Sequence, residues 1–95
     1  MDKYTDNSLV EPMDDIVLLN NNYKEWKLKE GYVGGVVENL IPEQGIILAD
    51  FYNPITGEDI KILAEIKKED FRVLGGHKDD IKIALAYRRL FKNQK

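Results

Sequence analysis

Cysteine is absent from the 95 residues, and histidine and tryptophan occur once each. The lack of cysteine excludes disulfides, thiolate zinc sites and cysteine nucleophiles. Because small secreted domains usually depend on disulfides, it also favours a cytoplasmic location. Apolar runs reach only about five residues, against the roughly 20 that a membrane helix needs, and residues 1–8 do not have the pattern of a signal peptide. We therefore expect no membrane partner.

Proline and glycine are also scarce, with three and seven copies, which excludes a low-complexity linker. Apolar residues make up 43% of the chain and charged residues 33%, as in a single small globular domain. The net charge of −3 disfavours nucleic acid as a partner, since it repels phosphate, and suits a basic protein surface.

Short β-rich segments separated by turn signals dominate the middle of the chain. Five strands are expected, at residues 15–19, 32–39, 45–52, 58–65 and 71–74. In the third, alternation places Ile47, Ala49 and Phe51 on one face. In the fourth, the same rule predicts that Ile60, Ile62 and Ala64 point inward.

Glycine and proline mark the connections between these strands. Asn53-Pro54-Ile55-Thr56-Gly57 is the strongest turn signal and predicts a positive φ at Gly57. Gly34-Gly35 predicts a bend or bulge where another backbone comes close. Residues 40–45 are expected to form a connecting loop, and residues 67–70 a polar turn with 3₁₀ character.

Two further segments flank the strands. Residues 1–13 are polar and aperiodic, and are interpreted as a flexible or loosely docked arm. Residues 75–95 are predicted to form a Gly75-Gly76 hinge and an amphipathic helix, acidic at its start and basic at its end. Helical spacing gives one apolar stripe that should pack against the body: Ile83, Ala84, Tyr87, Leu90 and Phe91.

This order of elements predicts a mainly β fold, a small five-stranded SH3-like barrel over residues 14–74 with an appended C-terminal α-helix. A different small Greek-key barrel is the alternative. Residues 15–74 resemble a family of short uncharacterised bacterial proteins with this barrel. The resemblance is carried by Asp15-Ile16-Val17-Leu18-Leu19, by the segment from Lys29 to Glu38, and by Glu69-Asp70-Phe71-Arg72-Val73-Leu74.

Members of that family are often encoded beside toxin-like genes, so the resemblance implies an antitoxin or immunity protein. The glycine pattern is also similar to the KOW motif of ribosomal and transcription-elongation proteins. This second similarity implies the alternative function, an accessory of the transcription or translation machinery.

The sequence offers little to support catalysis. His77 lies beside the Gly75-Gly76 pair, where exposure to solvent is expected. The acidic pair Asp79-Asp80 is explained by the helix dipole, and no phosphate loop, EF-hand loop or His-x-x-x-His pair occurs. We expect no enzyme activity, no cofactor and no metal site.

Binding of another protein is the favoured function, with a toxin as its most specific form. The predicted partner-binding residues are aromatic, acidic or apolar side chains of the loops and the helix: Tyr23, Trp26, Glu43, Tyr52, Ile81 and Leu85. Ile81 and Leu85 lie off the main stripe, so they are either core or a face for a partner or a second copy. Trp26 among lysines could stack on nucleic acid, although we favour a ring folded back onto the barrel.

Overall fold

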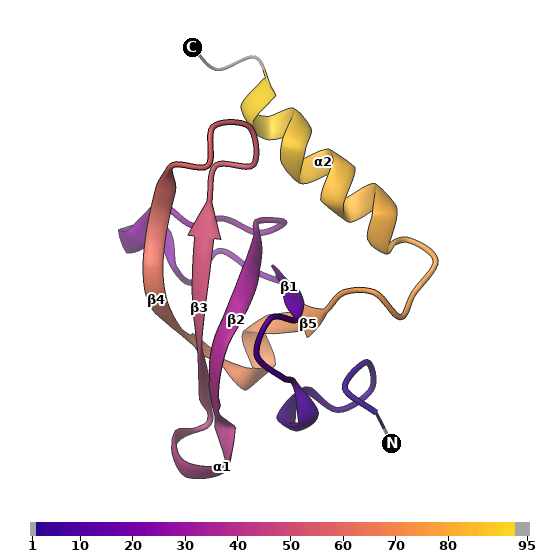
Figure 1. Cartoon of the computed structure of the whole chain (residues 1–95). Helices are drawn as coiled ribbons and strands as arrows, with labels where there is room; N and C mark the ends of the chain where they lie inside the picture. The colour runs from indigo at the N-terminus through magenta and orange to yellow at the C-terminus, as the bar shows by residue number, and fades with distance from the viewer. Residues whose placement is uncertain (1, 93–95) are drawn as a thin grey trace.

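The computed structural model describes residues 2–92, and its five strands form one antiparallel sheet in the order β4-β3-β2-β1-β5 (Figure 1). The strands are β1 (Asp15–Leu18), β2 (Val33–Leu40), β3 (Ile46–Tyr52), β4 (Asp59–Lys67) and β5 (Phe71–Val73). The helices are η1 (Asn7–Leu9), η2 (Lys24–Trp26), α1 (Ile41–Gln44), η3 (Lys68–Asp70) and α2 (Asp80–Lys92). The prediction of a mainly β fold with a C-terminal helix is confirmed.

The sheet is open between its two outer strands. Within residues 2–92, β4 pairs only with β3, and β5 pairs only with β1. The side chain of Tyr23 spans the gap instead, because its hydroxyl accepts from the Lys67 amide at 2.9 Å and donates to the Asp70 carboxylate at 2.6 Å. A side chain therefore joins the end of β4 to the residue that precedes β5.

The core lies on one face of the sheet, where β3 contributes its alternate residues. Ile47, Ala49 and Phe51 are completely buried, as the alternation predicts. Phe51 lies against Gly34 of β2, where a Cβ would come within 2.8 Å of the phenyl ring. A Cβ on Gly34 would also lie 2.9 Å from the backbone carbonyl oxygen of Asp50, so the predicted close approach of another backbone is right for Gly34. The irregularity in β2 lies further on, between Val36 and Glu38.

In β4 the alternation of inward and outward side chains shifts by one residue at a bulge. Ala49 is opposite Ala64, but Phe51 is opposite Lys61, so β4 has one extra residue in this interval. The Leu63 amide donates to the Asp50 carboxylate at 2.8 Å inside the bulge. Ala64 is buried as predicted, whereas the prediction for Ile62 is wrong, because the extra residue turns its side chain to the exposed face.

Two connections show the expected turn residues. Gly57 has a φ of 78°, which confirms the predicted left-handed position. The segment expected to be a loop at residues 40–45 forms the single helical turn α1, with Pro42 in its first turn. Gly45 ends this helix with a φ of 71°.

The N-terminal arm packs against the sheet and against η3. Val10 is buried in the core. The Asn7 amide donates to the carbonyls of Lys68 and Phe71 at 2.7 and 2.8 Å. These contacts place the arm beside the segment between β4 and β5.

Helix α2 meets the sheet through its last turns. Tyr87 and Phe91 pack on Tyr32, with ring centroids 5.3 and 5.5 Å apart. Ile83 is half-buried, but Leu90 is 51% exposed, so the prediction that Leu90 belongs to the packed stripe is wrong. Successive residues are about 100° apart around a helix, and the ring contacts of Tyr87 and Phe91 turn Leu90 to the side.

The Gly75-Gly76 segment is held by hydrogen bonds at the start of α2. The Asp80 carboxylate accepts from the amides of Gly75 and His77 at 2.6 and 3.0 Å and pairs with Arg72 at 3.0 Å. Burial raises the pKa of Asp80, but these hydrogen bonds and the Arg72 guanidinium outweigh it, so the pKa lies below its usual value. Asp80 thus ties the helix to β5.

Candidate functional site

Tyr23 and Trp26 lie together at the short helix η2, with Tyr23 as its N-cap and Trp26 as its last residue. Their rings are stacked, with centroids 5.7 Å apart, and the Lys61 ammonium lies 4.9 Å from the centre of the Trp26 ring. Tyr23 is only 7% exposed. Burial and the hydrogen bond to Asp70 raise the pKa of Tyr23 to about 12, so its hydroxyl stays protonated. The pair is engaged within the molecule, with Trp26 folded back onto Tyr23.

Asp70 is the buried carboxylate beneath this pair. It accepts from the Tyr23 hydroxyl and from the Asn20 amide at 2.8 Å, and its own carbonyl accepts from the Leu19 amide. Burial raises its pKa, but the hydrogen bonds from Tyr23 and Asn20 outweigh burial and lower it. These contacts explain why an acidic residue is tolerated before β5.

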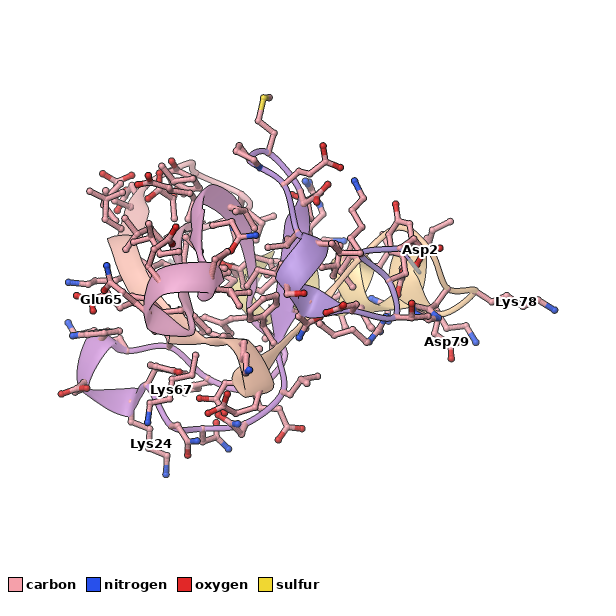
Figure 2. The ribbon with its side chains drawn as sticks, turned by 90° about the horizontal axis from the view of Figure 1, so that it is seen from below. Asp2, Lys24, Glu65, Lys67, Lys78 and Asp79 are labelled. Atoms are coloured by element: carbon pink, nitrogen blue, oxygen red, sulfur yellow. The ribbon has the colours of Figure 1, made fainter. Side chains whose placement is uncertain are left out.

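Glu43 stands apart from the other predicted partner-binding residues. It is exposed in α1, at the end of the sheet opposite the β3–β4 turn (Figure 1). Lys24 and Lys67 lie on the opposite side of the molecule from Lys78 and Asp79, which project from the start of α2 (Figure 2). Glu43, in α1, therefore lies on a different surface from Ile81 and Leu85, which are in α2 (Figure 1).

Tyr52, Ile81 and Leu85 gather around α2, beside a groove between this helix and the sheet. We call it the α2 groove. Its main part, about 370 Å³, is lined by Asp15, Val33, Gly34, Gly35, Tyr52, Pro54, Ala84, Tyr87 and Arg88. A smaller pocket of about 230 Å³ also contains Asp15, Val33 and Ala84 and reaches Leu74, Gly75, Asp80 and Ile81. The two pockets share these three residues, so they adjoin each other beside the helix.

Hydrogen bonds hold one end of the α2 groove. The Tyr87 hydroxyl donates to the carbonyl of Tyr52, and the Arg88 guanidinium donates to the carbonyl of Pro54 at 3.4 Å. Burial raises the pKa of Tyr87, so this hydroxyl remains a donor at neutral pH. Tyr52 itself is 40% exposed. These bonds join α2 to the segment at the end of β3, so the groove exists before any ligand binds.

One carboxylate, that of the exposed residue Asp15, lines the larger part of the α2 groove. Burial raises the pKa of this group, and the neighbouring Asp14 adds to the effect. Sequence reasoning did not identify Asp15 or Arg88 as site residues. No local signal could have done so, because each looks like an ordinary polar residue at a strand start or on a helix surface.

The outer face of α2 adjoins the groove. Ile81 is 74% exposed and Leu85 is 47% exposed, in agreement with an exposed apolar pair. From Ile81 to Lys92 the helix has four basic residues and no acidic one. Basic side chains therefore surround the apolar pair on this helix.

Among residues 2–92 there is no cluster of three or more His, Cys, Asp or Glu side chains that could hold a metal ion. No helix in the same range is long and apolar enough to cross a membrane. Comparisons of the chain with family models, with curated proteins and with solved structures found no match.

Proposed function

We propose that this chain is a non-catalytic protein-binding module that binds through the α2 groove and the Ile81–Leu85 pair beside it. The observation that carries the proposal is the open, largely apolar groove, whose wall is fixed by hydrogen bonds from Tyr87 and Arg88. A preformed concave surface loses little conformational entropy when a ligand binds. Tyrosine at its edge adds a side-chain type that is enriched at binding hot spots.

An SH3-like barrel is the proposed description of the body. It is supported by the strand order β4-β3-β2-β1-β5 and by η3 between β4 and β5. Such small β frameworks hold binding surfaces at their loops and ends. Here the helix would supply one wall of the binding surface.

An immunity or antitoxin protein of the cytoplasm is the most specific version of this function. Its support is the resemblance of residues 15–74 to proteins encoded beside toxin-like genes. In this version the module covers a functional surface of the toxin. Co-expression with the products of adjacent genes tests it, with co-purification of a toxin-like neighbour as the expected result.

Self-association through the outer face of α2 is less well supported than binding of a different protein. In a two-fold contact on Ile81 and Leu85, each copy would present to the other a helix face whose charged residues from Ile81 to Lys92 are all basic. Like charges at an interface oppose association. We therefore place the outer face against a different protein.

Selection of random extended peptides on the immobilised protein tests the binding function. We expect selected peptides to lose affinity for the double variant Ile81→Ser, Leu85→Ser. The matched control is Leu90→Ser, because Leu90 is about as exposed as Leu85 but lies about 140° or more around the helix from Leu85 and Ile81. Failure to select any peptide, or equal losses with the control, would contradict the proposal.

A further inference from the structure

Two adjacent glycines in β2 have different surroundings, and the difference concerns the floor of the α2 groove. A Cβ on Gly34 would lie 2.7 Å from the Phe51 ring, so core packing requires glycine there. A Cβ on Gly35 would have no neighbour within 4 Å, and the φ of Gly35 is not in the left-handed region. Glycine inside a strand often marks a bulge, a tight bend or a place where a ligand or another backbone comes close. The bulge of β2 lies further on, between Val36 and Glu38, so we interpret Gly35 as a place where another chain can come close.

Asp15 lies directly beside this open position. It is the cross-strand partner of Gly35 in the β1–β2 pairing. In the described part of the chain its carboxylate forms no hydrogen bond and no ion pair. Two nearby cations have other partners, since Lys3 pairs with Asp14 at 2.7 Å and Arg72 pairs with Asp80. Arg88, which lines the same part of the groove, donates to the Pro54 carbonyl and forms no ion pair with Asp15. Among the described residues, Asp15 is therefore an acceptor without a paired cation.

The remaining walls suit a long aliphatic chain that ends in a cation. Val33 and Ala84 line both parts of the groove, and the rings of Tyr52 and Tyr87 line the larger part. Lysine and arginine bury their aliphatic stems along apolar surface and keep the charged group at a polar partner. Tyrosine faces also attract cations.

We propose that the α2 groove binds an extended segment of a partner protein, with the segment's backbone crossing Gly35 and a lysine or arginine pairing with Asp15. This inference rests on the proposed function and adds the chemistry of the ligand. An extended backbone can approach a strand more closely than a helix of about 10 Å diameter can. A phosphate group is disfavoured, since Asp15 would repel it.

The test uses the selected peptides and a neutral replacement for the cation. We expect one position to be enriched in lysine or arginine, and replacement of that residue by norleucine to weaken binding about tenfold. The variant Asp15→Asn should bind both peptides equally, because the charge contact is then absent. Glu38→Gln is the control, an exposed carboxylate elsewhere on β2, and it should keep the tenfold preference.

Filling the groove gives a second test. Gly35→Leu places a side chain in open space and should abolish peptide binding while the amide NMR spectrum remains that of a folded protein. If Gly35→Leu does not fold, Ala84→Leu fills the groove from the exposed side of the helix and should have the same effect.

The outcomes separate the two proposals. Suppose that filling the groove at Gly35 or Ala84 abolishes peptide binding, but the peptides show no preference for a cation or keep that preference with Asp15→Asn. This result overturns the ligand chemistry and leaves the binding function in place. An absence of selected peptides, or binding that survives a filled groove, overturns the binding surface itself. Sedimentation measures whether the wild type dimerises. A dimer that Asp15→Asn abolishes would identify a second copy as the occupant of the groove and would overturn the proposal that a segment of a different protein binds there.

Discussion

The sheet and helix α2 are stabilised in different ways. The sheet is packed along its length, with residues such as Ile47, Phe51 and Phe71 completely buried. Among the 13 residues of α2, only Asp80, Tyr87 and Phe91 are buried. The helix is held near its two ends, by the hydrogen bonds of Asp80 and by the aromatic contacts of Tyr87 and Phe91. A helix held in this way can leave a groove between its ends.

Charge separates the same two regions. Residues 1–79 contain sixteen acidic and nine basic residues, whereas α2 contains one acidic and four basic residues. The ion pair between Arg72 and Asp80 crosses from one region to the other. The body and the outer face of the helix therefore present opposite charge to a partner, and the α2 groove lies at the boundary between them.

The largest loss of stability is expected from the sheet. Phe51→Ala should reduce the free energy of unfolding by about 3–5 kcal/mol, because it removes a completely buried ring that packs on Gly34. Urea unfolding followed by circular dichroism measures the change. A loss below about 1 kcal/mol would mean that the ring is not in a packed core.

Truncation of a side chain in α2 should reduce the free energy of unfolding by less than Phe51→Ala does, and the loss should depend on which side chain is removed. Phe91→Ala should cost about 2–3 kcal/mol, because it removes the ring contacts with Tyr32 and Tyr87. Leu90→Ala, at the adjacent position, should cost less than about 1 kcal/mol since that side chain is half exposed. Equal losses in urea unfolding would show that both sides of the helix are packed.

Acid should weaken the attachment of the helix. The pKa of Asp80 is lower in the folded protein than in the unfolded chain, so its contribution is present above about pH 4 and is lost as the pH falls through the folded pKa. Asp80→Asn should be less stable at pH 7 and should lose less stability between pH 5 and pH 2. Urea midpoints across this range measure the difference. Asp79→Asn, at the exposed neighbour, should behave as the wild type does.

The smallest effect is expected on the outer face of α2. The double variant Ile81→Ser, Leu85→Ser should change the free energy of unfolding by less than about 1 kcal/mol, because Ile81 is largely in solvent and Leu85 is half exposed. Thermal unfolding measures this directly. A loss as large as that of Phe91→Ala would mean that these residues support the fold and do not form a free binding face.

Local rules in the sequence determined much of the body. The alternation of β3 was readable because side chains on a strand point to opposite faces with a period of two. The position of Gly57 followed from turn chemistry, and the acidic start and basic end of α2 followed from the helix dipole. Each of these features depends on neighbours in the sequence, so no tertiary contact was needed to predict it.

Tertiary structure alone decided which apolar side chains are exposed and where the candidate site lies. The bulge in β4 exposes Ile62 because of a register set by its pairing with β3, and the contacts of Tyr87 and Phe91 with Tyr32 leave Leu90 in solvent. The α2 groove brings Asp15 beside Ala84, two residues far apart in the chain. Contacts of this kind depend on how whole elements pack, and the periodicity of a single segment carries no information about them.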